Sequence, residues 1–240
     1  MTYLFPLLVV LYTLVLGTLG ILLCLVVPGG RALMPVGRLW SRLILRSGGV
    51  STRATYDRSL DPGRACVYAA NHQSQFDIPA LVVTMPADFR MVAKRSLLYI
   101  PVFGWALWLA GFIFIDRSNR EQAIQSLKRA ARRLRQGTSI VVFAEGTRSS
   151  EGTLLPFKRG GFVMAIEAGV PVVPVTIRGG REILPKGSLR VRPGRIDVHF
   201  GAPVDTGAYD YENRDALIAR VRQAIADVLA TEAAAPPVRV

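Results

Sequence analysis

The stretch CVYAANHQSQFDIPALVVTM, residues 66–85, contains a strand pattern, a polar turn and a helix pattern in direct succession. Residues 66–70, Cys-Val-Tyr-Ala-Ala, have the pattern of a short buried strand, and Ile78 to Met85 form an apolar segment suited to a short helix. Between them lie Asn71 to Asp77, with His72 just past the predicted strand end. Strand ends are where α/β proteins place ligand groups, so this turn is the first candidate site.

His72 and Asp77 together suggest proton-transfer chemistry. An imidazole is suited to taking a proton near neutral pH, and a carboxylate on its second ring nitrogen fixes its tautomer and stabilises its cation. On one regular helix, side chains five residues apart diverge by about 140°, so the pair requires a turn, with Asp77 opening the next helix. The alternative is that Asp77 caps the helix before Ile78-Pro79 while His72 binds loop backbone. These residues alone leave both readings open.

Three further motifs follow at a distance: GFIFIDR at 111–117, FAEGTRS at 143–149 and VPVVPV at 170–175. With the N-H-x-x-x-x-D pattern of residues 71–77, their order and spacing resemble the glycerolipid acyltransferase family, in particular its 1-acyl-sn-glycerol-3-phosphate acyltransferases. The resemblance covers about residues 50–205. It implies a glycerol-3-phosphate acyltransferase-like α/β fold, in which a mixed sheet is flanked by helices.

The resemblance also implies roles for the residues of the first motif. His72 would be the general base and Asp77 would orient it. Acyl transfer to an alcohol needs no nucleophile from the protein, because the acceptor's own hydroxyl attacks. Ser74 stays open as a covalent nucleophile, although the chain has no Gly-x-Ser-x-Gly elbow.

The other motifs are expected to bind the acceptor. An arginine after a strand end suits phosphate, although a plain turn with a surface Glu–Arg pair is the alternative. Residues 170–175 are expected to place a strand beside the site and to border an acyl groove. The candidate substrate-binding residues, most of them carried by the resemblance, are Lys94, Arg117, Glu145, Gly146, Thr147, Arg148 and Lys158.

The N-terminus predicts membrane attachment. Tyr3 to Val27 contains no charged residue and would extend about 37 Å as a helix, against roughly 30 Å of bilayer hydrocarbon. A cleaved signal peptide is disfavoured, because there is no basic leader and the apolar run is too long. Whether the segment crosses the membrane or bends back stays open. Pro28-Gly29-Gly30 breaks it.

A basic amphipathic helix is expected next, from Arg31 to Ser47, with arginines four residues apart that suit an anionic membrane surface. The arginine excess after the apolar segment places the bulk of the chain in the cytoplasm, on the inner (cytoplasmic) membrane. We therefore expect an anchor and basic helix over 1–50, a catalytic domain over 51–230 and a loose tail over 231–240.

Within the catalytic domain, apolar patterns alternate between strand and helix, which predicts a mixed α/β sheet. Helix 101–109 is expected to be buried, and helix 120–135 to carry its cations, Lys128, Arg129, Arg132 and Arg133, on a solvated face. Strands are expected at 51–58, 66–70, 89–93, 111–115, 139–144, 172–177 and 195–200, and further helices at 78–85, 160–168 and 216–229.

The composition narrows the class of partner. The 240 residues carry a formal net charge of +13, which favours an anionic partner. No interleaved aromatic and basic motif supports nucleic-acid binding. Cys24 and Cys66 have neither metal-ligand spacing nor a disulfide pattern, and no metal or permanent cofactor is implied.

The function implied by the resemblance is transfer of a fatty acyl group from acyl-CoA or acyl carrier protein to lysophosphatidic acid, giving phosphatidic acid in phospholipid biosynthesis. Glycerol 3-phosphate or another lysolipid as acceptor stays open, as does a membrane lipid hydrolase.

Overall fold

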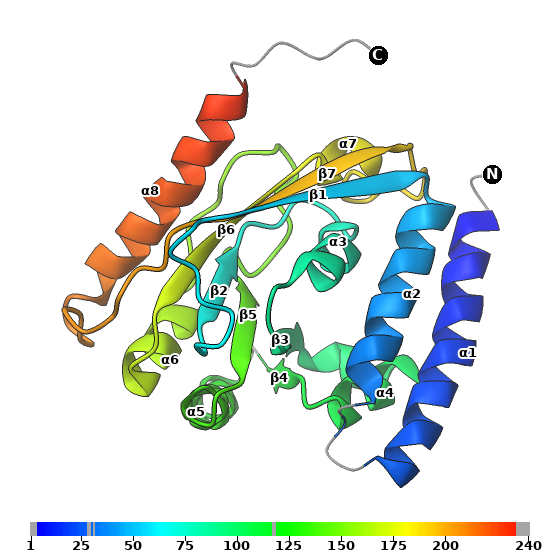
Figure 1. Ribbon diagram of the computed structural model, residues 1–240, viewed down its shortest axis with the longest axis horizontal. Coiled ribbons are helices and arrows are strands. Elements are labelled where there is room, and N and C mark those ends of the chain that lie inside the picture. The colour runs from blue at the N-terminus through cyan, green and yellow to red at the C-terminus, as the bar shows by residue number, and fades with distance from the viewer. Residues whose placement is uncertain (1–3, 28–29, 31, 117–118, 234–240) are drawn as a thin grey trace.

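A computed structural model describes residues 4–27, 30, 32–116 and 119–233 of the chain (Figure 1). Its centre is a seven-stranded sheet in the order β1-β7-β6-β2-β5-β3-β4. Among the seven strands described, β6 and β7 are the one pair that runs antiparallel, so the predicted mixed sheet is confirmed. The strands are β1 Val50–Tyr56, β2 Val67–Ala70, β3 Phe89–Lys94, β4 Ile113–Ile115, β5 Ser139–Phe143, β6 Val172–Arg178 and β7 Gly194–Phe200.

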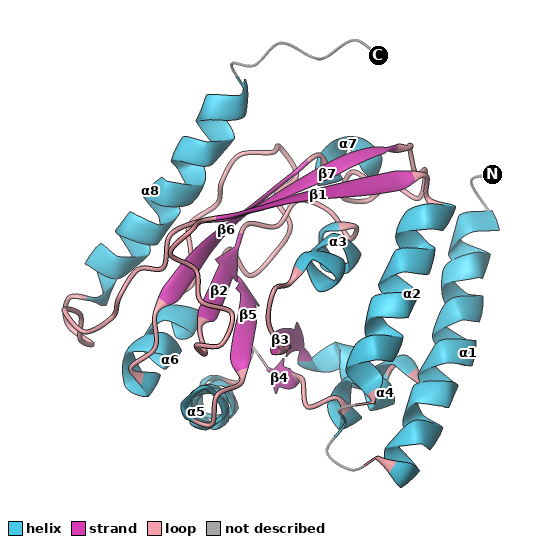
Figure 2. Cartoon of the chain, in the orientation of Figure 1, coloured by secondary structure: helices cyan, strands magenta, loops and turns pink. Residues whose placement is uncertain are grey.

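Helices cover both faces of this sheet (Figure 2). Tyr68 and Ala70 of β2 face a core shared with α1, α2 and α3, whereas Val67 and Ala69 face a second core shared with α5, α6 and α8. The alternation follows from the two-residue period of a strand. The helices are α1 Leu4–Val26, α2 Leu33–Ser47, α3 Asp77–Thr84, α4 Phe103–Leu109, α5 Arg120–Arg135, α6 Gly160–Ala168, α7 Gly180–Ile183 and α8 Arg214–Ala233, with a 3₁₀ helix, η2, at Arg95–Tyr99.

The central strand β2 is held on both sides and leads directly into the candidate site. All four of its residues are buried, and it pairs parallel with β5 and β6. The side chain of Asn71 then extends the ladder: its Nδ2 donates to the Ile177 carbonyl at 2.9 Å, and the Ile177 amide donates to its Oδ1 at 2.7 Å. The turn that follows is thereby fixed to the end of the sheet.

The first two helices form an antiparallel pair against the sheet domain (Figure 1). Trp40 of α2 donates its indole N–H to the Thr13 hydroxyl of α1 at 3.0 Å, and Tyr12 and Ser47 share a hydrogen bond of the same length. Within the described residues, α1 is the one helix long and apolar enough to cross a membrane. The predicted apolar helix is therefore present from Leu4 to Val26, while Tyr3, Pro28, Gly29 and Arg31 lie outside the described residues.

The prediction of a buried helix at 101–109 is wrong in one respect. The helix forms as α4, but its only buried residue is Gly104, and Trp105 and Trp108 are 53% and 62% exposed. A seven-residue helix that is apolar on all sides can bury only the side that meets its neighbours, here α1 and η2.

Smaller differences lie at element ends. The short elements η2 and α7 were not expected. Helix α8 continues to Ala233, beyond the expected end at Leu229, and the remainder of the predicted tail, 234–240, lies outside the described residues.

Candidate active site

The turn after β2 brings His72 and Asp77 together. The Nδ1 atom of His72 lies 2.9 Å from Oδ2 of Asp77, the first residue of α3. The same oxygen accepts the backbone N–H groups of Gln73 and Ser74, each at 2.7 Å. The Asp77 carboxylate therefore lies under the turn. The sequence allowed either a His72–Asp77 pair or a helix cap with His72 on loop backbone, and the structure shows the pair.

Asp77 is fully buried beneath this turn. Gly180 of α7 closes over it so tightly that an added Cβ would stand 2.1 Å from Oδ1 of Asp77. A side chain at position 180 would displace the carboxylate, which explains glycine there. Because Nδ1 of His72 faces Asp77, Nε2 is the ring nitrogen left to exchange a proton with a substrate.

Phe143, the last residue of β5, stacks on the imidazole with ring centroids 3.8 Å apart and an interplanar angle of 18°. Two residues later, Glu145 is 2% exposed, and its two oxygens accept the backbone N–H groups of His72 at 2.7 Å and Leu155 at 2.9 Å. Burial raises the pKa of Glu145, and the hydrogen bonds from Leu155 and His72 oppose that shift. Its carboxylate thus ties the backbone of His72 to the loop around Leu155.

The turn after β5 places Arg148 beside His72. Gly146 adopts φ +71°, a left-handed conformation that lets the chain reverse at the strand end. The Ser149 amide then donates to the His72 carbonyl at 2.9 Å, and Lys186 donates its ammonium to the Arg148 carbonyl at 3.0 Å. The third motif is therefore tied to the first by a main-chain hydrogen bond.

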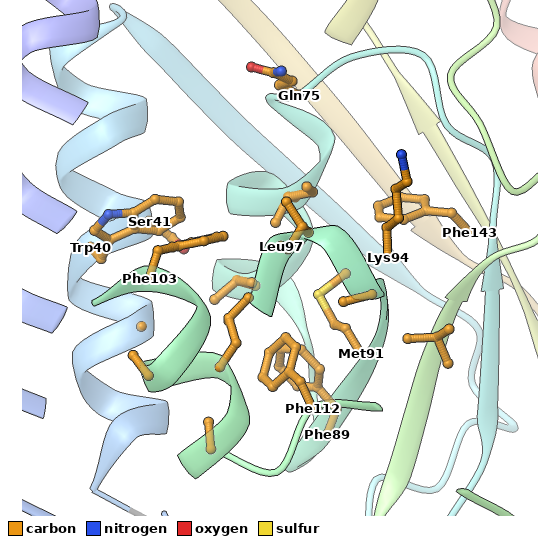
Figure 3. A pocket seen from close by; sticks show the side chains of 18 of the residues that line it. Trp40, Ser41, Gln75, Phe89, Met91, Lys94, Leu97, Phe103, Phe112 and Phe143 are labelled. Carbon is orange, nitrogen blue, oxygen red and sulfur yellow. The ribbon is translucent and has the colours of Figure 1, made fainter. Parts of the chain in front are cut away.

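His72 opens onto a cavity of about 620 Å³. Gly146, Thr147 and Arg148 line it together with Lys94 at the end of β3, and the rest of its wall is mostly apolar. Figure 3 shows Lys94 beside Phe143, with aromatic and aliphatic side chains filling the other side of the cavity. The apolar wall includes Leu16 of α1, Trp40 of α2, Ile78 and Val82 of α3, Phe89 and Met91 of β3, Phe103 and Leu107 of α4, and Phe112.

The remaining predicted residues are placed differently. Lys158 is exposed and does not line the cavity, and Arg117 lies outside the described residues. Ser74 is fully buried, where its hydroxyl donates to the Leu184 carbonyl at 2.9 Å and accepts the Phe76 amide at 3.2 Å. Both capacities of this hydroxyl are used by the backbone, so its geometry does not suit a nucleophile.

Residues 172–175 do belong to a strand beside the site, β6, which pairs with β2, but none of residues 170–175 lines the cavity that His72 opens onto. The cavity lies over β5 and β3, and β2 separates both strands from β6 in the sheet. The residues that form the wall instead come from α1, α2 and α4, which sequence reasoning missed. Phe143 had a local signal, its place at a strand end two residues before Glu145, whereas the helical residues meet only through tertiary packing.

Comparison with known proteins gives a consistent result. The family model described as "Acyltransferase" matches residues 52–178. The 1-acyl-sn-glycerol-3-phosphate acyltransferase alpha of Ovis aries is 38% identical over 168 residues, 70% of this chain and 58% of the relative. The chloroplastic 1-acyl-sn-glycerol-3-phosphate acyltransferase BAT2 of Brassica napus is 41% identical over 146 residues, 58% of this chain and 42% of the relative. The chain thus spans less than two thirds of the length of these relatives.

One solved structure has the same fold over almost the whole chain. It is the crystal structure of the 1-acyl-sn-glycerophosphate (LPA) acyltransferase PlsC from Thermotoga maritima, with a TM-score of 0.79, 24% identity and coverage of 98% of both chains. The family match extends over more than half of the 240 residues and includes the His72–Asp77 pair and the turn that carries Arg148. This chain therefore belongs to the acyltransferase family.

Proposed function

We propose that this chain is a membrane-associated 1-acyl-sn-glycerol-3-phosphate acyltransferase. It moves a fatty acyl group from acyl-CoA or acyl carrier protein to the free hydroxyl of lysophosphatidic acid, forming phosphatidic acid. The observation that carries the proposal is the His72–Asp77 pair at the polar end of a mostly apolar cavity, beside Lys94 and Arg148. The names of the relatives support the same substrates.

The proton chemistry follows from the orientation of the imidazole. With Nδ1–H donated to Asp77, Nε2 of His72 accepts the proton of the acceptor hydroxyl as its oxygen attacks the thioester carbonyl. The tetrahedral intermediate then collapses, the C–S bond breaks, and the departing thiolate takes the proton from the imidazolium. Asp77 stabilises the imidazolium between these two steps.

Substrate binding divides between the two ends of the cavity. The volume of about 620 Å³ is within the roughly 300–1,000 Å³ of small-molecule pockets, and its apolar side suits an acyl chain. Arg148 and Lys94 supply cations at the polar end for the acceptor's phosphate, since a guanidinium grips phosphate oxygens with two parallel hydrogen bonds. Thr147 and Gly146 line the same end, while Arg117 and Lys158 are proposed to add charge near it. Glu145 acts through the backbone of His72.

The N-terminal helix is proposed to hold this site at the membrane. The outward side of α1 is apolar, with Leu7 65% and Leu14 48% exposed, while its other side packs on α2 and α4. We propose that this outward side lies in the cytoplasmic membrane and that the catalytic domain faces the cytoplasm, as the arginine excess predicts. Leu14→Glu should release the folded protein from vesicles, whereas Ala230→Glu on exposed α8 should not. Equal vesicle binding by both variants would contradict this attachment.

A single assay tests the reaction against its rivals. The purified full chain in lipid is given lysophosphatidic acid, glycerol 3-phosphate or lysophosphatidylcholine with either acyl-CoA or acyl carrier protein. We expect phosphatidic acid to form with lysophosphatidic acid and free thiol to appear only when an acceptor is present. Free fatty acid released without an acceptor would establish a hydrolase, and preference for another acceptor would overturn the substrate assignment.

A further inference from the structure

A second hollow shares Phe112 with the active-site cavity. It measures about 640 Å³ and is bounded by η2, α4, β4 and one side of α5, from Gln122 to Arg133. Phe112 borders both hollows, but His72, Lys94 and Arg148 border only the first. The side chains of the second, which we call the arginine groove, belong to Arg95, Leu98, Trp108, Phe112, Ile113, Phe114, Asp116, Gln122, Gln125, Ser126, Arg129 and Arg133.

The charges in the arginine groove are unbalanced. Three arginines line it, but only one acidic residue, Asp116, which pairs with Arg95 at 3.5 Å. Arg129 donates to the Ser126 hydroxyl at 2.9 Å and Arg133 donates to the Gly111 carbonyl. Within the described residues, neither Arg129 nor Arg133 is paired with a carboxylate. Partial burial, together with the nearby charge of Arg90, lowers the pKa of Arg133, as expected for a cation that lacks a counter-anion.

Helix α5 divides its cations between the groove and solvent. The sequence predicts a solvated face for all four, and Lys128, Arg129 and Arg132 are exposed while Arg133 is half-buried. Arg129 and Arg133 line the groove, whereas Lys128 and Arg132 do not. The one-turn spacing of Arg129 and Arg133 brings two guanidinium groups to the same side of the helix. Two planar forks on one wall suit the oxygens of a phosphate.

An exposed tryptophan lines the groove. Trp108 is 62% exposed, and Tyr99 and Trp105, which are near it in the chain but do not line the groove, are 70% and 53% exposed. Exposed tryptophan and tyrosine are typical of the membrane–water interface, where one side of the ring is apolar and the other is wet. Helix α4, which supplies Trp108 to the groove, also packs on α1, the helix with the exposed apolar side.

We propose that the arginine groove binds the head-group phosphate of an anionic phospholipid, separately from the acyl acceptor. The phosphate lies between Arg95, Arg129 and Arg133, and the glycerol end of the lipid lies against Trp108 and Phe112. A lipid is favoured over a soluble phosphate because exposing Trp108 to water is unfavourable, whereas contact of its ring with a bilayer is favourable. The site would hold the enzyme beside anionic lipid whichever acceptor it uses.

The test measures binding of the full-length protein to vesicles of phosphatidylcholine with or without phosphatidylglycerol. Three proteins are compared: wild type, Arg129→Gln and Arg132→Gln. Each variant loses one positive charge from the same helix, Arg129→Gln inside the groove and Arg132→Gln outside it. Salt at about 0.5 M suppresses general attraction to the surface, because the screening length falls well below 10 Å. Inorganic phosphate and coenzyme A are titrated separately as soluble phosphate sources.

We expect Arg129→Gln to weaken binding to phosphatidylglycerol vesicles about tenfold, as for loss of a charged hydrogen-bonding partner, and Arg132→Gln to stay within about twofold of wild type. Binding to pure phosphatidylcholine should be the same for all three. Equal losses in both variants, or no loss in either, would overturn the site. A loss confined to inorganic phosphate or to coenzyme A would overturn the lipid assignment. These readouts do not use acyl transfer, so they stand apart from the proposed reaction.

Discussion

Replacing Asp77 with asparagine removes the negative charge beside Nδ1 of His72 while keeping the size of the side chain. An asparagine carbonyl at the position of Oδ2 can still accept from His72, Gln73 and Ser74, so the turn keeps its hydrogen bonds. Its NH₂ group would stand where Oδ1 now has no hydrogen-bond partner among the described residues. We therefore expect a folded protein destabilised by about 1–3 kcal/mol, as for a buried donor without an acceptor.

The loss of activity follows from the missing negative charge. In the transition state His72 becomes a cation with its Nδ1 atom 2.9 Å from Oδ2 of Asp77, which places the charge centres about 4 Å apart. At an effective dielectric constant of about 20, that pair is worth about 4 kcal/mol. Since each 1.4 kcal/mol changes a rate about tenfold, kcat should fall about 10³-fold. The free substrates do not create the cation, so KM should change little.

The assay follows thiol release with lysophosphatidic acid and a saturating acyl donor, with circular dichroism to confirm folding. The matched control is Asp205→Asn, an exposed aspartate that accepts the Gly207 amide within its own turn. In an His72→Ala background, Asp77→Asn should cost almost nothing more, because Asp77 acts through the imidazole. A folded Asp77→Asn protein with kcat within about tenfold of wild type would refute this reasoning.

Three further changes test other parts of the site. Arg148→Lys keeps the charge but loses the planar fork, so kcat/KM for the acceptor should fall about 10- to 100-fold while kcat/KM for the donor is retained; the reverse pattern, measured by varying each substrate in turn, would move Arg148 to the donor. Gly37→Leu adds a side chain to the cavity wall of α2, where a Cβ meets no atom within 4 Å. It should stabilise the helix by about 0.5–1 kcal/mol yet lower kcat/KM for the longest acyl donors about tenfold, and an unchanged chain-length profile would count against the cavity as the acyl site. Glu145→Gln leaves one backbone N–H without an acceptor and should cost about 1–3 kcal/mol of unfolding free energy. The fold raises the pKa of Glu145, so this residue contributes most to stability below its pKa in the unfolded chain. That contribution is lost as pH rises through its pKa in the folded protein. The difference in urea-unfolding free energy between wild type and Glu145→Gln should therefore shrink over this pH range.

Local pattern was sufficient for most of the fold. Helix α5 was predicted at 120–135 and α6 at 160–168, with the bounds that the structure has, because each has an apolar stripe or segment with clear limits. The His72–Asp77 pair was also within reach, since the turn that joins them is only four residues long.

The rest depended on contacts between distant segments. Nothing in the order Phe-Ala-Glu shows that Glu145 will accept an amide from His72, 73 residues earlier. Nor does the apolar run of α4 show that Trp105 and Trp108 point outward, because burial depends on which neighbours pack against the helix. Arg129 lines the arginine groove and Arg132 does not, although both lie off the apolar stripe of α5. This difference too depends on which segments pack beside the helix.

The pairing of β1 with β7 also determines when, during synthesis, the sheet can be completed. Residue Val50 is hydrogen-bonded in register with Gly194, so the first strand to leave the ribosome lacks its partner until about 140 further residues have been made. At synthesis rates of about 5–20 residues per second, that delay is roughly 7 to 28 seconds. During it, α1, α2 and β1 exist without β7, which alone joins β1 to the rest of the sheet. The slow step of folding is therefore expected to be the closure of this long-range pair, and a nascent chain stalled before Gly194 should contain the catalytic turn but lack the completed sheet.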